Sequence, residues 1–439
     1  MIEEDPRELL ARGPMTGMQI LVVAITVGLT GLDGFDVLSI SFASPGIAHE
    51  WGINRAALGV VLSMELFGMG IGSILLGGVA DRVGRRKTLL GCLVLMTLGM
   101  AMASGVHGLV ALCLWRVVTG LGIGGMLASN NAVAAEFSSA RRRDLSVSMM
   151  AIGYPLGAII GGSIAAQLLK SGNWRVVFEF GAACTATFFP IVFWCVPESV
   201  GWLCRVQPAG ALAMLNRSLA RLGHAAVARL PAAAPTTQRA TLIDLFRPGM
   251  ALSTTLVTLT YFLHITTFYF IIKWVPKIVV DMGFAASAAA GVLVWANVGG
   301  AAGGAALGLL TQRFGLKPLT IALLIGSTFM VAAFGHGQRD LTSLSLICAL
   351  AGFCTNGGVV GVYAVLARAF PTELRASGTG FAVGVGRGGA VIAPIIAGVL
   401  FQAGIGLQLV AIVMGAGSLV AAVCLALLPA KSMSPHSVS

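Results

Sequence analysis

Charged side chains are scarce in this sequence. Asp, Glu, Lys and Arg together make up 10% of the 439 residues, whereas a soluble domain carries about 25%. That shortage argues against a water-soluble enzyme of this length. The sequence also lacks an H-E-x-x-H motif, a phosphate-binding loop and a G-x-S-x-G motif. Such motifs carry enzyme chemistry, so we expect neither an enzyme nor a receptor.

Cysteine pairs and an N-terminal positive charge are missing as well. None of the eight cysteines forms a C-x-x-C pair, and seven fall within apolar runs. This pattern predicts buried free thiols rather than a zinc site or disulfides, and we expect no metal and no cofactor. The first 16 residues contain Glu3, Glu4, Asp5 and Glu8. A cleaved signal peptide begins with a positive region, so none is predicted here.

Hydrophobic residues, in contrast, reach 57%, and the mean hydropathy is +0.91. Most of this apolar surface must face lipid, which indicates a protein that crosses the membrane several times. Twelve apolar runs are long enough to cross ~30 Å of hydrocarbon. They cover residues 17–42, 54–80, 88–105, 108–137, 143–169, 174–197, 249–279, 285–311, 317–335, 341–369, 375–402 and 406–429.

The basic residues predict the orientation. The formal net charge is +11, but the basic residues lie in short clusters between apolar runs, which does not fit a nucleic-acid partner. If both termini are cytoplasmic, the cytoplasmic segments hold 20 of the 28 Lys and Arg residues. This bias favours an inner (plasma) membrane protein with both termini inside the cell. Lys273 and Lys277 are assigned to a helix end on the opposite face.

A long polar interruption predicts the domain organisation. We expect an N-terminal six-helix bundle at 1–197, a cytoplasmic linker at 198–247 and a C-terminal six-helix bundle at 248–439. The two halves echo each other, because GGVADRVGRRK at 77–87 resembles GLLTQRFGLK at 308–317. EFSSARR at 136–142 parallels AFPTELR at 369–375 at nearly the same offset. Duplicated halves are typical of secondary transporters.

Several motifs carry a family resemblance along essentially the whole chain. G-x-x-x-D-R-x-G-R-R after the second run, R-x-x-x-G-x-G at 116–122 and PESVGWL at 197–203 resemble the major facilitator superfamily. DGFD at 33–36, NWRVVF at 173–178, KWVPKIVVDMG at 273–283 and GVGRGGAVIAP at 384–394 resemble its aromatic acid:proton symporter family.

The resemblance implies an all-α membrane fold of twelve transmembrane helices in two pseudo-symmetric bundles. It also implies proton-coupled uptake of small organic anions, in particular aromatic carboxylates, by alternating access in a monomer. The partners would be the organic anion, protons and the lipid bilayer. Carriers of nicotinate, dicarboxylates, sugar acids or drugs, including exchangers and exporters, share this background and stay open as alternatives.

Three charges in the first and fourth runs are candidates for proton coupling. Asp33 and Asp36 share a helix face, and Asp36 lies ~28 Å along its run, in the outer half. Arg116 lies about 12 Å below the outer end of its own run, at comparable depth. Protonation of Asp36 would release Arg116, as a proton-coupled carrier requires. By resemblance, the two match the pair of proton-coupled sugar carriers, and Asp33 is the additional acid of the aromatic-acid family. A permanent salt bridge is the structural alternative.

Two further charges lie near the midplane. Arg387, ~18 Å from the inner end of its run and surrounded by glycines, is the candidate anchor for an anionic substrate, because its guanidinium binds a carboxylate bidentately. Glu65 departs from the families named above. It is a candidate proton site, although it could also neutralise Arg387 or select a substrate with a positive group.

Aromatic and polar residues complete the predicted substrate pocket. Tyr261, His264 and Phe268 form one helical stripe in the seventh run, which lines the cavity in the resembled fold and would stack on a ring substrate. A neutral, hydrogen-bonded His264 that only packs is an open alternative. The remaining pocket candidates are polar or aromatic side chains in other runs: Tyr154, Trp295, Asn297 and Asn356.

The loops at the predicted inner face contain candidate gating residues. They combine acidic and basic side chains at the ends of several runs: Asp81, Arg82, Gly84, Arg85, Glu136 and Arg142. Opposite charges on separate helices could latch the two bundles together while the cavity faces outward. Each surface ion pair contributes under ~1 kcal/mol, so several would have to act together. Simple positive-inside anchoring is the alternative.

Overall fold

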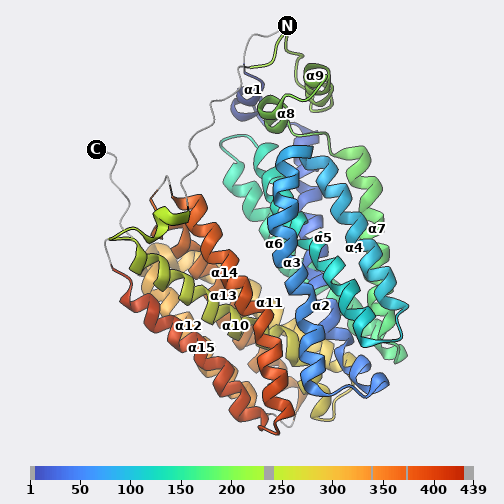
Figure 1. Ribbon diagram of the computed structural model, residues 1–439, viewed down its shortest axis with the longest axis vertical. Helices are drawn as coiled ribbons and strands as arrows, with labels where there is room; N and C mark the ends of the chain where they lie inside the picture. The colour runs from blue at the N-terminus through green and yellow to red at the C-terminus, as the bar shows by residue number, and fades with distance from the viewer. Residues whose placement is uncertain (1–4, 232–241, 338–339, 372–373, 430–439) are drawn as a thin grey trace. The chain divides into compact units, whose positions relative to one another are not determined.

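The computed structural model describes residues 5–231, 242–337, 340–371 and 374–429, and its regular elements there are helices (Figure 1). The helices are α1 (Pro6–Arg12), α2 (Gly17–Trp51), α3 (Arg55–Val83), α4 (Arg85–Ser104), α5 (Leu109–Glu136), α6 (Arg143–Leu168), η1 (Leu169–Ser171), α7 (Arg175–Cys195), α8 (Val200–Val206), α9 (Ala211–Arg221), η2 (Leu242–Phe246), α10 (Ala251–Asp281), α11 (Ala286–Phe314), α12 (Leu316–Gly335), α13 (Leu341–Ala369), α14 (Arg375–Gln402) and α15 (Leu407–Leu427).

Twelve of these helices are long and apolar enough to cross a membrane, which confirms the number predicted from the sequence. The largest difference is at α2, which continues to Trp51 instead of ending at 42. Pro45 lies inside the helix, and Ser44 Oγ donates a hydrogen bond to the carbonyl of Ser41 one turn earlier. Proline is tolerated in membrane helices where serine side chains and neighbouring helices satisfy the backbone.

The internal repeat is visible in the turns between α3 and α4 and between α11 and α12. Gly84 in the first turn has a φ of 113°, and Gly315 in the second has a φ of 80°. L-residues with a side chain rarely adopt such angles, so both turns require glycine. The two echoed sequence segments therefore build the same sharp reversal in each half.

Contacts between Cα atoms divide the helices into two units. Within the described residues, the first unit contains 5–37, 67–158 and 175–231, and the second contains 38–66, 159–174 and the described part of 242–429. Helices α2, α3 and α6 each contribute to both units. Because the units do not follow chain order, the boundaries expected at 197 and 247 stay a prediction.

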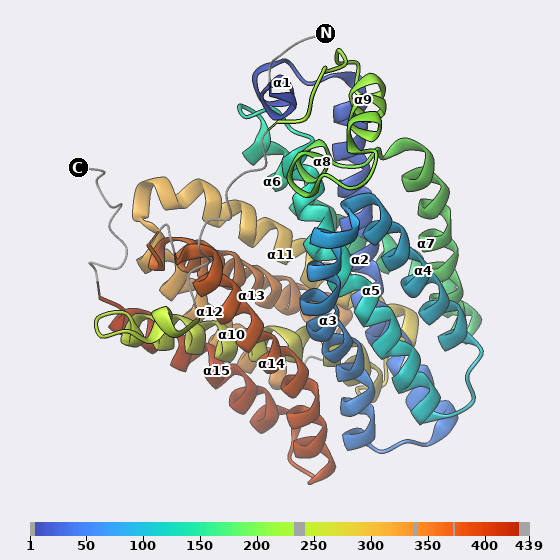
Figure 2. The ribbon, with the colours of Figure 1, turned by 45° about the horizontal axis from the view of Figure 1, so that its top comes forward.

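In the first unit, α4 packs between α5 and α7, and glycines allow α2 and α6 to touch. A Cβ on Gly157 would lie 1.8 Å from the main-chain oxygen of Gly31. The predicted linker contains α9, which lies next to α8, and α8 also contacts α1 (Figure 2). Small residues at helix crossings are characteristic of membrane helix packing.

In the second unit, α11 packs on α13, and α10 packs on α14 and α15. A Cβ on Gly299 would lie 1.8 Å from the oxygen of Ala349, and one on Gly352 would lie 1.9 Å from the oxygen of Ala296. The end segments of α2, α3 and α6 also belong to this unit. Residues from these segments and from α10 and α14 form the polar contacts of the second unit, which are described below.

Candidate functional site

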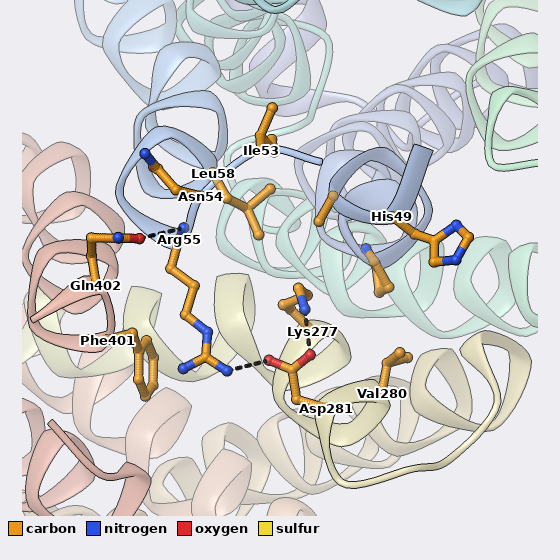
Figure 3. Close-up of a pocket in the computed structure, with 12 residues that line it drawn as sticks. His49, Ile53, Asn54, Arg55, Leu58, Lys277, Val280, Asp281, Phe401 and Gln402 are labelled. Carbon is orange, nitrogen blue, oxygen red and sulfur yellow. Dashed lines mark hydrogen bonds and ion pairs between the residues drawn. The ribbon is translucent and has the colours of Figure 1, made fainter. Parts of the chain in front are cut away.

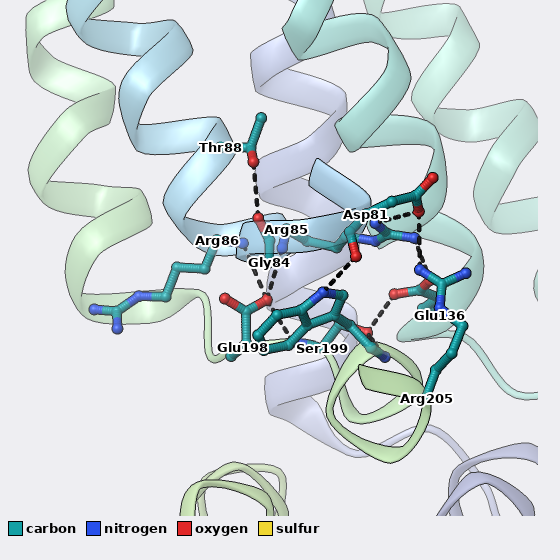
Figure 4. A network of polar contacts seen from close by, with 10 residues as sticks. Asp81, Gly84, Arg85, Arg86, Thr88, Glu136, Glu198, Ser199 and Arg205 are labelled. Carbon is teal, nitrogen blue, oxygen red and sulfur yellow. Dashed lines mark hydrogen bonds and ion pairs between the residues drawn. The ribbon is translucent and has the colours of Figure 1, made fainter. Parts of the chain in front are cut away.

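The predicted gating residues Asp81, Arg85 and Glu136 lie together in the first unit (Figure 4). Arg85 Nη1 donates to Asp81 Oδ1 at 2.9 Å, and Arg85 Nη2 lies 3.4 Å from Glu136 Oε1. Arg205 of α8 reaches the same Asp81 oxygen at 2.8 Å. Ser199, the N-cap of α8, donates a hydrogen bond to Glu136. The network therefore joins the α3–α4 turn to α5 and to the start of the linker.

Glu198 is a member of this network that the charge pattern alone did not reveal. Its side chain is 8% exposed, and Oε1 accepts hydrogen bonds from the backbone amides of Arg85 at 2.8 Å and Arg86 at 3.2 Å. These are the first two N–H groups of α4, which have no partner within the helix. A carboxylate there is also favoured by the helix dipole. Its position within PESVGWL was the available sequence signal.

Arg82 and Arg142 were also predicted to gate, but the structure places both on the surface, outside this network. The contacts of Asp81, Arg85 and Glu136 described above all lie within the first unit. Their interpretation as a latch between two bundles therefore stays a prediction.

The predicted coupling charges of the first unit lie in its core. Asp33, Asp36 and Arg116 are all completely buried. Arg116 Nη2 donates to the main-chain carbonyl of Asp36 at 3.1 Å, and its guanidinium lies 5.3 Å from the ring centroid of Phe178. The extension of α2 brings Asp36 closer to the middle of its helix than expected, because Asp36 is 19 residues from Gly17 and 15 from Trp51. It still lies in the half of the helix that was predicted to be outer.

The second unit contains a buried ion pair inside the membrane spans. Glu65 of α3 and Lys273 of α10 are completely buried, and Lys273 Nζ lies 3.4 Å from Glu65 Oε2. Glu65 was expected near the midplane, with Arg387 as a possible partner. Lys273 was assigned to a helix end, but α10 continues for eight further residues to Asp281. A lysine within an apolar run is itself a signal of function that the sequence reading did not use.

Arg387 lies on α14 beside two buried tyrosines of α10. Tyr261 and Tyr269 are both within electrostatic range of Arg387, and Tyr269 also interacts with Glu65. The hydroxyl groups of Tyr261 and Tyr363 are 2.8 Å apart. A Cβ on Gly386 would lie 1.9 Å from Tyr261 Cδ1, so the glycine beside Arg387 permits Tyr261 to pack closely against α14. Tyr261 thus packs against the residue next to Arg387, and Tyr269 lies within electrostatic range of both Arg387 and Glu65. We call these four residues the polar cluster.

His264 does not join that cluster. Its Nε2 lies 2.8 Å from the main-chain oxygen of Thr355 and its Nδ1 lies 2.8 Å from Ser418 Oγ. This geometry fits a neutral imidazole that donates to the carbonyl and accepts from the hydroxyl. The structure therefore favours the alternative in which His264 connects α10, α13 and α15. Phe268, the third member of the stripe, is half-buried and packs edge-on against Tyr269 at a centroid distance of 5.2 Å.

The remaining pocket candidates lie in different surroundings. Asn356 Nδ2 donates to the carbonyl of Gly300 at 2.7 Å, which connects α13 to α11, and Asn297 Nδ2 donates within its own helix. Trp295 is 54% exposed. Tyr154 lies in the first unit, where its carbonyl oxygen faces Gly34 of α2. None of these contacts assigns the four residues to one pocket.

Within the described ranges, no group of three or more His, Cys, Asp or Glu side chains could hold a metal ion. All eight cysteines are free thiols.

Comparison with known proteins decides the family. The family model described as Major Facilitator Superfamily matches residues 26–334 and 257–438. The chain belongs to the major facilitator superfamily. It is 31% identical to the gallate transporter of Pseudomonas putida over 96% of this chain and 94% of that protein. It is 29% identical to the 4-hydroxybenzoate transporter PcaK of Pseudomonas putida, over 88% and 87% of the two chains.

The fold is shared with solved members of the superfamily. The partially occluded inward open structure of the xylose transporter XylE from E. coli matches with a TM-score of 0.74 at 16% identity, over 96% of this chain and 100% of that chain. This superfamily protein is a multi-pass membrane transporter and not an enzyme.

Proposed function

We propose that this transporter imports hydroxylated aromatic carboxylates together with protons, by alternating access. Two relatives along nearly the full chain are named for gallate and for 4-hydroxybenzoate. Both acids combine a carboxylate, a benzene ring and ring hydroxyl groups. This chain offers a matching set of groups around Arg387: one cation, aromatic rings, and the hydroxyls of Tyr261 and Tyr363.

The observation that carries the proposal is the set of fully buried charges within apolar helices. Asp33, Asp36 and Arg116 lie in the first unit, and Glu65 and Lys273 in the second. Burying an ion in a low-dielectric interior costs several kcal/mol even after relaxation. The Coulombic attraction of a buried partner offsets a cost of about this size. Charges retained under that cost mark ion and proton pathways in membrane proteins.

In the proposed cycle, a proton neutralises Asp36 and weakens its electrostatic attraction for Arg116. A second proton acceptor, Glu65, controls Lys273 in the same way. Loss of the negative charge on Glu65 leaves Lys273 available to the substrate carboxylate, which then replaces the missing counter-ion. Proton and organic anion are therefore bound together or not at all, because either one alone leaves a buried charge uncompensated.

Arg387 holds the same substrate carboxylate together with Lys273, through the planar pair of N–H donors of its guanidinium. The ring of the substrate then lies against the aromatic side chains of α10, and its hydroxyls replace the mutual hydrogen bond of Tyr261 and Tyr363. An aliphatic acid of the same charge lacks both interactions. The pocket thereby selects aromatic over aliphatic carboxylates.

The proposed setting is a bacterial inner membrane, with a monomer whose two termini are cytoplasmic. The asymmetric distribution of Lys and Arg supports this orientation, because basic residues accumulate in cytoplasmic loops. Arg55 and Asp81 lie at opposite ends of α3. In this orientation Asp81 is at the cytoplasmic end and Arg55 at the external end.

The deciding experiment uses the purified protein in proteoliposomes. Radiolabelled 4-hydroxybenzoate and gallate are offered under an inward proton gradient, with hexanoate as the aliphatic control, while external pH is recorded. We expect accumulation of the aromatic acids and substrate-driven alkalinisation outside. Accumulation without proton movement contradicts the coupling, and equal uptake of hexanoate contradicts the aromatic selectivity.

A further inference from the structure

A cavity of about 480 Å³ opens in the second unit where α2, α10 and α14 end and α3 begins (Figure 3). Its volume is within the ~300–1,000 Å³ of typical small-molecule sites. Arg55, Phe401 and Gln402 face Lys277 and Asp281 of α10 across it. Apolar side chains from α3 and α10, including Leu58 and Val280, line the remainder. The residues considered above for proton coupling and substrate binding do not line this cavity.

The cavity contains more positive than negative side chains. Arg55 Nη2 lies 3.1 Å from Asp281 Oδ2, and Lys277 pairs with the other oxygen of the same carboxylate. Two cations therefore share one anion, and His49 also lines the cavity. The side chains of Arg55 and Asp281 are 46% and 32% exposed, so an anion from solution can reach them. The guanidinium also lies 5.6 Å from the ring centroid of Phe401, which provides an aromatic wall.

A second relationship connects this cavity to the buried ion pair. Lys277 and Lys273 are four residues apart and so lie on the same face of α10, about 6 Å apart along the axis. The helices α3 and α10 are joined twice, by Arg55 with Asp281 and by Glu65 with Lys273. In the first pair α3 supplies the cation, and in the second pair α10 supplies it. An anion that moves along α10 therefore meets first Lys277 and then Lys273.

We propose that this cavity is an external capture site for the carboxylate of the transported acid. The arriving carboxylate replaces Asp281 on Arg55, its ring lies on Phe401, and the first of the two connections between α3 and α10 opens. Lys277 then directs the acid toward Lys273. This inference rests on the proposed function, because it takes the cargo to be an aromatic carboxylate and this end of α3 to be external.

The test measures binding of 4-hydroxybenzoate by isothermal titration to the full-length protein in zwitterionic nanodiscs. Four proteins are compared: wild type, Arg55→Gln, Arg387→Gln and the double variant. We expect two bound equivalents for wild type, one for each single variant and none for the double variant. The neutral analogue 4-hydroxybenzyl alcohol should not bind at the outer site. Arg217→Gln, which removes an exposed arginine from α9, is the matched control and should bind as wild type does.

Transport provides a second readout that a merely structural role would not produce. Arg55→Gln should raise KM about tenfold with little change in the maximal rate, because a charge-assisted contact is lost only during capture. Asp281→Asn should act in the opposite direction and lower KM, since the acid no longer displaces a carboxylate.

The failures are distinguishable. Wild-type stoichiometry in Arg55→Gln, or a KM raised equally by both substitutions, overturns the capture site alone. Absence of binding and uptake of any aromatic acid by the wild-type protein overturns the proposed function and, with it, this inference.

Discussion

Lys273 Nζ lies 3.4 Å from Glu65 Oε2, and neither side chain has any exposed surface. The pair joins α3 to α10 inside two membrane-spanning helices, ten residues after the start of α3 at Arg55 and eight residues before the end of α10 at Asp281. Its cation differs chemically from Arg116, because a lysine ammonium is a compact charge with three rotatable donors. This property suits a group that exchanges a protein carboxylate for a substrate carboxylate.

Removing one partner of this pair should destabilise the protein more than removing both. We expect Lys273→Met or Glu65→Gln to cost about 3–5 kcal/mol, because each leaves a buried group without its counter-ion. The double variant should recover most of that stability and still not transport. Thermal unfolding of the four proteins in one detergent measures this double-mutant cycle. Strictly additive losses would show that the two side chains do not interact.

Replacement of Asp36 by Asn should separate substrate movement from the proton gradient. An amide cannot titrate at physiological pH, so the carrier keeps a permanently neutral side chain next to Arg116. We expect counterflow of labelled substrate to persist while accumulation driven by a pH gradient disappears. Asp36→Glu is the control that keeps the titrating group. Gradient-driven accumulation by Asp36→Asn would contradict the coupling role.

Arg387→Lys should weaken the binding of the transported carboxylates. Lysine keeps the charge but loses the planar pair of donors, and loss of one charge-assisted hydrogen bond, about 1.5–3 kcal/mol, corresponds to a roughly 10- to 100-fold rise in KM. Arg313→Lys, on an exposed part of α11, is the matched control. The measurement is initial uptake across a panel of aromatic and aliphatic acids. Unchanged KM values would place the substrate carboxylate elsewhere.

The two glycine turns of the repeat should respond differently to alanine. Both have backbone angles that only glycine adopts easily, so Gly84→Ala and Gly315→Ala should each cost about 1–3 kcal/mol. Gly84→Ala should be worse, because its Cβ would lie 2.4 Å from Glu198 Oε2, whereas the nearest atom to a Cβ on Gly315 is 3.7 Å away. The melting temperatures of the two variants and of the wild-type protein measure this difference. Equal losses would show that Glu198 moves aside without consequence.

The sequence alone predicted the elements better than the partners. Apolar run length located twelve spans because a helix in lipid must satisfy its own backbone. The end of α2 was missed by nine residues, because the helix continues through Pro45 to Trp51. The same error placed Asp36 too far from the middle of the helix. Helix limits in a membrane depend on tertiary packing as well as on local propensity.

Partners of single charges could not be assigned from spacing along the chain. Glu65 and Lys273 are 208 residues apart, and only the tertiary arrangement brings α3 to α10. His264 illustrates the converse, because its stripe pattern fits a pocket as well as a core. Its hydrogen bonds to Thr355 and Ser418, on two other helices, favour the role in the core.

The glycine contacts between α11 and α13 limit how the second unit can deform. Gly299 and Gly352 each bring their backbone against a main-chain oxygen of the other helix, with no room for a single methyl group. A slide of one residue would drive a neighbouring side chain into that oxygen. The two helices are thus interlocked and should move together as one rigid body. Any rearrangement during transport must then take place at other helix contacts.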